Sequence, residues 1–148
     1  MTSDGIETAD WDKVHELALA IANCSEDKSA DADEFARTRG RLFSLLDELE
    51  GKYGARPSLL ATRADYVDSP VERERHLRRA YDAARELDDV KNLVWVASSL
   101  ASYYMEEASD LDEGAQWLGA LREHLLICPD EHEQAEVQRL EELLLKGS

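Results

Sequence analysis

The sequence predicts an all-α fold built of antiparallel helical hairpins. Leu and Ala supply 40 of the 148 residues, whereas Val, Ile and Thr together supply 14, and this balance favours helices over strands. Apolar residues recur at helical spacing along most of the chain. Three segments also share one spacing of large and small side chains, with an alanine where a second helix can approach closely: Val14, Leu17, Ala18 and Ile21; Leu60, Arg63, Ala64 and Val67; Ala97, Leu100, Ala101 and Tyr104.

The N-terminal third of the chain is expected to hold a tail and two helices. Residues 1–9 show no periodicity, so we expect a flexible tail there and a single helical domain over residues 10–148. Asp10 can cap a first helix that runs to about Asn23. An acidic cap at Asp31 opens the second helix, which glycines end near residue 51.

Five further helices are expected after these two. Pro57 suits the first turn of a helix, where its missing N–H would be unpaired anyway. Ser69 and Glu72 form a capping box around Pro70, which is the strongest start signal in the chain. A helix must end before Pro129, because proline disfavours α geometry in the residue before it. The expected helices cover residues 58–67, 70–87, 90–107, 110–128 and 130 onward.

The spacing of large and small residues resembles that of the tetratricopeptide repeat (TPR). The residues that carry this resemblance are Ala97, Leu100, Ala101 and Tyr104 in a first helix, Ala80 and Ala115 at the small position of second helices, and Pro129 at a repeat end. The resemblance covers about residues 11–145 and implies hairpins stacked as a short right-handed superhelix of about seven helices. In such an array the last helix is a C-terminal capping helix.

A TPR-like superhelix would present the first helix of each hairpin on its concave side. Helical projection then predicts an acidic groove with one large aromatic side chain, Trp95, which we interpret as a binding anchor; ordinary burial of this tryptophan is the alternative. Met105 is interpreted either as a groove contact or as core filler. The expected groove residues are Asp12, His15, Ser58, Ala61, Asp65, Asp68, Trp95, Ser98, Ser102, Met105 and Glu106.

A second candidate surface is basic. Four arginines of the helix over residues 71–87 share one face, which could receive an acidic partner or the acidic part of a second copy. The pairing of Glu74 with Arg78, and of Asp82 with Arg85, instead favours an ordinary solvated helix face. The four residues are Arg75, Arg78, Arg79 and Arg85.

Charge and composition narrow the function classes. The net charge of −16 makes nucleic acid a poor partner and favours a basic or amphipathic protein. The chain has no apolar run long enough to span a membrane, and its acidic start is unlike a signal peptide. Two cysteines, Cys24 and Cys128, are too few for a disulfide framework. We therefore expect a cytoplasmic protein without a membrane partner.

No motif predicts catalysis, a cofactor or a metal. The sequence lacks a glycine-rich phosphate loop, a nucleophile elbow and a Glu-x-x-His pair. His124, Cys128 and His132 have the four-residue spacing of helical metal ligands, but Pro129 interrupts that helix. We therefore expect a protein that is not an enzyme and that holds no cofactor and no metal.

Three functions remain open from the sequence. The first is a small acidic masking protein, such as an immunity protein or a chaperone, that binds a basic or amphipathic protein partner. The second is a self-assembling scaffold, a homo-oligomer in which the arginine-rich helix of one copy meets the acidic surfaces of another. The third is a regulator that binds a small ligand between helices, suggested by Tyr53, Tyr66, Tyr103 and Tyr104.

Overall fold

Seven α-helices follow one another in the computed structural model, which describes residues 1–26 and 32–147. The predicted all-α class with seven helices is confirmed for this part of the chain. Residue Ser148 and the cap predicted at Asp31 fall outside it. The elements are α1 (Thr8–Glu26), α2 (Ala32–Tyr53), α3 (Pro57–Tyr66), α4 (Pro70–Glu86), α5 (Val90–Ser102), the π-helical η1 (Tyr103–Glu107), α6 (Leu111–Ile127) and α7 (Glu131–Gly147).

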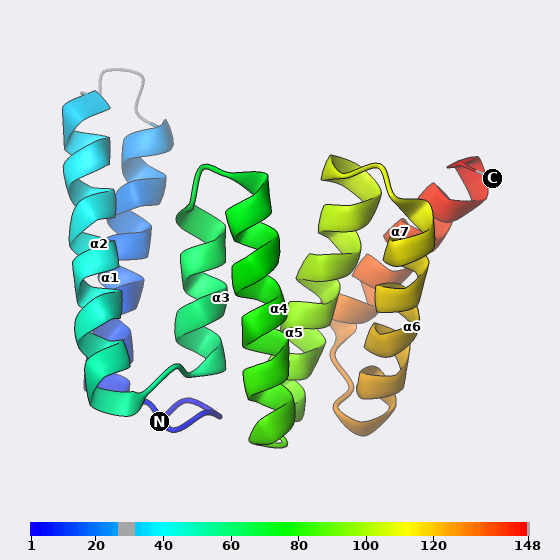
Figure 1. Cartoon of the computed structure of the whole chain (residues 1–148), viewed down its shortest axis with the longest axis horizontal. Helices are drawn as coiled ribbons and strands as arrows, with labels where there is room; N and C mark the ends of the chain where they lie inside the picture. Colours follow the sequence, from blue (N-terminus) through cyan, green and yellow to red (C-terminus); the bar gives the residue numbers. More distant parts are fainter. Residues whose placement is uncertain (27–31, 148) are drawn as a thin grey trace.

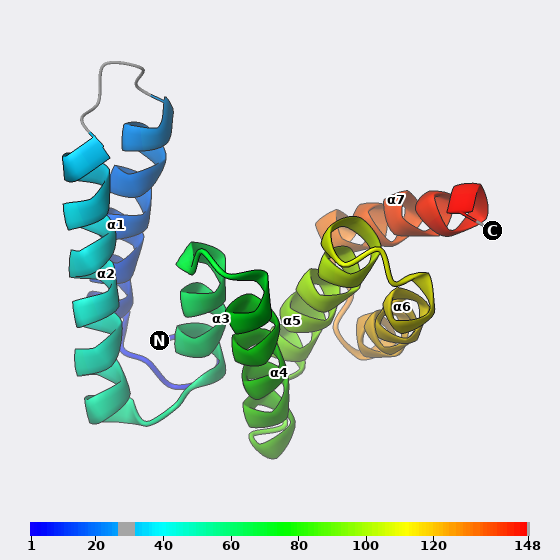
Figure 2. The same cartoon turned by 45° about the horizontal axis from the view of Figure 1, so that its top comes forward.

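The helices form a row of hairpins (Figure 1). Helices α1 and α2, α3 and α4, and α5 and α6 pair with each other, and α7 packs against both α5 and α6. Alternate helices are also in contact: α3 packs against α5, and α5 packs against α7. Figure 2 shows the α1/α2 hairpin at one end of the row and α7 at the other. The right-handed superhelix stays a prediction.

Side chains near the helix starts explain where several helices begin. The Ser69 hydroxyl accepts a hydrogen bond of 3.4 Å from the Glu72 N–H, which confirms the predicted start of α4. The Asp110 carboxylate caps α6 in the same way, at 3.1 Å from the Glu113 N–H. Pro57 lies in the first turn of α3, as expected. These caps satisfy backbone donors that a helix start leaves without partners.

Buried apolar side chains gather in two clusters. The C-terminal cluster joins α3 to α7 and is centred on fully buried residues such as Leu100 and Leu118. The N-terminal cluster lies between α1 and α2 and includes Leu42 and Leu46. Leu59 of α3 belongs to the N-terminal cluster, whereas its neighbour Leu60 belongs to the other. Helix α3 therefore connects the two cores.

Residues 1–7 are packed, so the expected flexible tail over residues 1–9 was wrong. Ile6 is completely buried in the N-terminal cluster. The buried Asp4 carboxylate accepts a hydrogen bond of 2.8 Å from the Ser58 N–H at the start of α3. Ser3 donates to the Asp89 carboxylate at 3.0 Å, so the segment also reaches the residue that caps the start of α5. Periodicity could not reveal this packing because the segment is not regular secondary structure.

The predicted cap at Asp10 was also wrong. Helix α1 begins at Thr8, so Asp10 lies inside its first turn. Its carboxylate accepts hydrogen bonds from the Lys52 ammonium at 2.8 Å and from the Tyr53 hydroxyl at 2.5 Å. These bonds lower the pKa of the Asp10 carboxyl against the effect of desolvation. Asp10 therefore ties the start of α1 to the end of α2.

The helix expected over residues 90–107 changes its winding near its end. After Ser102 the chain continues as the π-helix η1, where the Ala108 N–H donates to the Tyr103 carbonyl at 3.0 Å. A π-turn holds more residues than an α-turn, so every side chain after Ser102 is rotated from its expected position. This rotation turns Met105 into the core, against Gly114 of α6.

Candidate functional site

Two neighbouring hollows lie on the face formed by α3, α5 and α7. The first, which we call the acidic hollow, has a volume of about 420 Å³ and lies between these three helices, with further lining residues from α4 and η1. Four carboxylates line it, together with one arginine and one histidine. These residues are Asp65, Glu107, Glu133, Glu136, Arg73 and His132.

The second hollow contains two tryptophans, and we call it the indole hollow. Its volume is about 450 Å³. Trp11 of α1 and Trp95 of α5 line it, with Ser58 from the first turn of α3. Trp95 and Glu133 line both hollows. The two hollows together therefore form one groove, with Trp95 and Glu133 at their junction.

The carboxylates of the acidic hollow differ in their partners. Glu107 forms an ion pair with Arg73. Glu136 accepts a hydrogen bond of 2.5 Å from Arg139, which lies one turn further along α7. Within the described part of the chain, neither Asp65 nor Glu133 forms an ion pair. These two carboxylates are therefore available for a cation from outside the fold.

Asp65 has the most perturbed carboxyl group of the groove. Desolvation raises its pKa to about 6, and the nearby Arg73 guanidinium opposes this rise. The side chain nevertheless keeps a large solvent-exposed surface. Water therefore weakens the desolvation, but the pKa of this carboxyl stays above its ordinary value. A cationic ligand would favour the ionised form of this carboxyl.

Replacing Asp65 with asparagine is expected to stabilise the fold at pH 7.5. Because the pKa is raised in the folded state, the ionised carboxyl opposes folding above pH 6, and this cost disappears as the pH falls toward the ordinary value of 3.8. The stability gain of Asp65→Asn should therefore shrink below pH 6 and vanish near pH 4. Thermal denaturation across this pH range measures it, with the exposed Asp12→Asn as control. Equal melting temperatures of the two variants at pH 7.5 would contradict the expectation.

Several of the predicted groove residues do lie in the groove. The acidic hollow is lined by Asp65, Trp95, Ser98 and Ser102, and the indole hollow by Ser58. Trp95 is half-buried rather than fully exposed, because its ring also packs against the C-terminal cluster. Trp95 therefore both lines the groove and packs against the core, and its role as a binding anchor stays a prediction.

The placement of Met105 and Glu106 in the groove was wrong. Met105 is buried against α6, and Glu106 points to Arg139, which donates to it at 2.6 Å. Tyr103 and Glu107 line the acidic hollow in their stead. The cause is the π-helix η1, because a projection at the α-helical period gives the wrong face after Ser102.

Asp12, His15 and Asp68 do not line either hollow. Asp12 and His15 are exposed on α1, and the hairpin that carries them contacts α3 through α2. Asp68 follows α3 and forms an ion pair with Arg39 of α2 at 2.6 Å. Their placement assumed that α1 stacks on α3 as α3 does on α5. We correct it, because the α1/α2 hairpin has its own core.

The groove residues of α1 and α7 were not predicted from the sequence. Trp11 packs against the N-terminal cluster and lines the indole hollow as well. His132, Glu133 and Glu136 were missed because the last helix was regarded only as a cap. A helical projection of that helix as a further inner helix could have found them.

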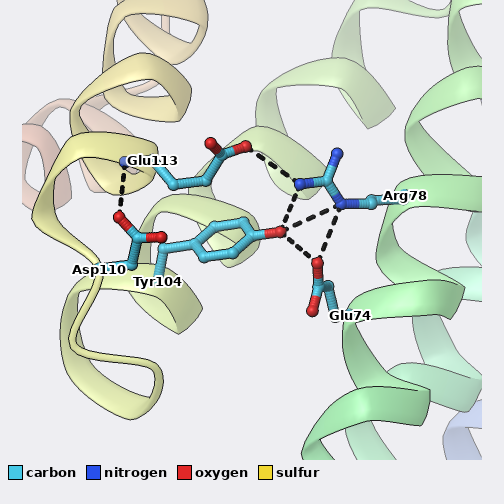
Figure 3. A network of polar contacts seen from close by, with 5 residues as sticks. All are labelled: Glu74, Arg78, Tyr104, Asp110 and Glu113. Atoms are coloured by element: carbon cyan, nitrogen blue, oxygen red, sulfur yellow. Dashed lines mark hydrogen bonds and ion pairs between the residues drawn. The ribbon is translucent and has the colours of Figure 1, made fainter.

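The predicted basic patch is divided in the structure. Arg78 is held within the fold: it donates to the Tyr104 hydroxyl at 3.0 Å, to Glu113 at 3.0 Å and to Glu74 at 3.2 Å (Figure 3). Arg75 lies 3.8 Å from the Glu72 carboxylate. Arg79 and Arg85 are exposed. Arg78 therefore connects α4 to η1 and α6, and the patch is smaller than predicted.

Removing the Tyr104 hydroxyl should destabilise this junction. It donates a hydrogen bond of 2.5 Å to Glu74, and desolvation together with this bond raises its pKa to about 12. Tyr104→Phe deletes bonds to two charged groups, so we expect a loss of about 1.5–3 kcal/mol in the free energy of unfolding. Urea denaturation measures it. Tyr66→Phe, at a hydroxyl without a hydrogen bond among the described residues, is the control, and equal losses would contradict the expectation.

The tyrosines that suggested a small-ligand site do not gather around one hollow. Tyr103 lines the acidic hollow, whereas Tyr53 is bonded to Asp10 and Tyr104 to Glu74. Over the described ranges, no group of three or more His, Cys, Asp or Glu side chains could hold a metal ion. In the same part of the chain, every helix is too short or too polar to cross a bilayer.

Comparisons with protein-family models, with curated proteins and with solved structures found no match for this chain. The resemblance to the tetratricopeptide repeat therefore stays a prediction from the sequence.

Proposed function

We propose that this chain is a non-catalytic protein-binding module that masks a basic or amphipathic segment of a protein partner. The single observation behind the proposal is the groove, in which an acidic hollow and an indole hollow meet at Trp95 and Glu133. Tryptophans in such positions are frequent anchors of protein interfaces. The carboxylates of Asp65 and Glu133, which form no ion pair with any described residue, complement a cationic segment.

The charge of the whole molecule supports the same proposal. With a net charge of −16 the chain attracts basic partners at long range and speeds their association. A masking protein, in the manner of an immunity protein or a chaperone, benefits from such fast capture. We propose a cytoplasmic setting, which suits the two free thiols of Cys24 and Cys128. Hairpins stacked as in a TPR-like superhelix are part of the same proposal.

Selection from a random peptide library tests this function without a known partner. The full chain is immobilised at low ionic strength, and phage that display random dodecapeptides are selected on it. We expect enrichment of peptides rich in Arg and Lys, with affinities that fall steeply as salt screens the groove. Enrichment of acidic peptides would contradict the proposal. So would enrichment of basic peptides no stronger than that on an unrelated acidic control protein.

A further inference from the structure

Two oxygen atoms of the indole hollow have no hydrogen-bond partner among the described residues. One is the Ser58 hydroxyl oxygen, on a residue that is only 4% exposed. The other is Oε2 of Glu133, which is shielded from water although the residue as a whole is half-buried. Leaving such atoms unpaired is costly, most of all for a charged oxygen. Both atoms can accept hydrogen bonds, and the Ser58 hydroxyl can also donate one, yet neither atom has a partner among the described residues.

Several polar groups of the lining donate elsewhere, and the Met1 ammonium donates to the Thr8 hydroxyl at 2.6 Å. The Asn92 side-chain amide already donates to Ser3 at 3.2 Å and to Asp89 at 2.6 Å. The Ser58 N–H donates to Asp4. Lys91, the lysine of the lining, is exposed. The two unpaired oxygens therefore point to a ligand that brings several donors at once.

The walls of the hollow restrict the ligand further. Trp11 and Trp95 present indole rings, on which a flat cation stacks more favourably than a neutral polar group. A guanidinium is planar, always charged and carries five N–H donors, whereas an ammonium is compact and strongly hydrated. Glu133 also supplies the negative charge that a buried guanidinium requires.

We propose that the indole hollow binds an arginine side chain of the partner segment. Its guanidinium pairs with the Glu133 carboxylate beside Ser58 and lies against Trp95, while neighbouring basic residues of the segment occupy the acidic hollow. This inference rests on the proposed function, and it goes further by naming arginine, rather than positive charge in general, as what the groove recognises.

Glu133→Gln and Glu136→Gln form a matched pair for the test. The two glutamates lie three residues apart on α7, both line the acidic hollow, and each substitution removes one negative charge. Glu136 already has a partner in Arg139, whereas Glu133 has none. If Glu133 makes a contact specific to arginine, Glu133→Gln should weaken peptide binding more than Glu136→Gln does. If the groove only attracts positive charge, the two substitutions should weaken binding equally.

The test uses the tightest peptide from the selection and calorimetric titration of the full chain. Three versions of the peptide are compared, with the arginine kept, replaced by lysine, or replaced by the neutral isostere citrulline. We expect Glu133→Gln to weaken the arginine peptide about 30-fold or more, as for loss of one partner of a buried charge pair. Glu136→Gln should lower the affinity for this peptide only a few-fold, and Ser58→Ala should lower it by a similar factor. The lysine and citrulline peptides should bind weakly and be nearly insensitive to Glu133→Gln.

The possible outcomes separate the two proposals. If no basic peptide is selected, the proposed function fails. If basic peptides bind but Glu133→Gln and Glu136→Gln lower their affinity equally, the arginine site is overturned and the masking function stands. The same holds if lysine replaces arginine in the peptide without loss of affinity. Thermal denaturation of each variant establishes that it is folded, and Ser58→Ala provides an independent change on another helix if one glutamine variant fails to fold.

Discussion

Replacing Ile6 with alanine is expected to lower the free energy of unfolding by about 2–5 kcal/mol, the usual cost of truncating a buried isoleucine. Ile6 is completely buried between α1 and α2, although it lies in a segment without regular structure. The side chain anchors the N-terminal segment, in which Asp4 is hydrogen-bonded to the start of α3 and Ser3 to the cap of α5. Its loss should therefore loosen the connection between the two cores as well as the N-terminal cluster.

Urea denaturation, combined with amide hydrogen exchange, measures the effect of Ile6→Ala. Exchange should accelerate most in α1 and α2, because their core loses the side chain. The control is Leu19→Ala on α1, which removes a side chain that is 63% exposed and should change stability little. If Ile6→Ala were no more destabilising than this control, residues 1–7 would not be part of the fold.

Replacing Trp95 with alanine should weaken the binding of basic peptides by about 30-fold or more. Anchors at the centre of an interface contribute about 2 kcal/mol or more when truncated. Trp95 lines both hollows, so its removal changes the whole groove. Trp95→Phe keeps an aromatic ring for packing and should retain part of the affinity.

The control for Trp95→Ala is a substitution at a tryptophan outside the groove. Trp117 of α6 packs against Tyr81 at 4.8 Å between ring centres and lies near Arg78. Trp117→Phe should leave peptide affinity unchanged. Fluorescence titration with the selected peptides measures these affinities. If Trp95→Ala bound the peptides as tightly as the unchanged chain does, the groove would not be their binding site.

The regular parts of the fold were predictable because their signals are local. The capping box at Ser69 and the prolines at positions 57 and 129 mark helix boundaries through backbone chemistry alone. The packing of Ile6 depends on a contact with helices far along the chain, which periodicity does not record. The π-helix at Tyr103–Glu107 also has no signature in the spacing of apolar residues.

The groove was predictable only where α-helical geometry holds. Asp65, Trp95, Ser98 and Ser102 were placed correctly because α3 and α5 wind regularly up to Ser102. Beyond that residue the π-turn changes the face that lines the hollow. The role of Glu133 depends on how α7 packs against α5, and its unpaired oxygen is a property of the three-dimensional arrangement.

The central claim is that the face of α3, α5 and α7 binds a basic segment of a protein. Two-dimensional ¹H–¹⁵N NMR of the labelled full chain, titrated with the selected basic peptide, tests it most directly. We predict shifts of the indole N–H signals of Trp11 and Trp95, and of backbone amides in α3, α5 and α7, while the indole signal of Trp117 stays in place. Shifts confined to α2 and α6, with the signals of Trp11 and Trp95 unchanged, would contradict the claim.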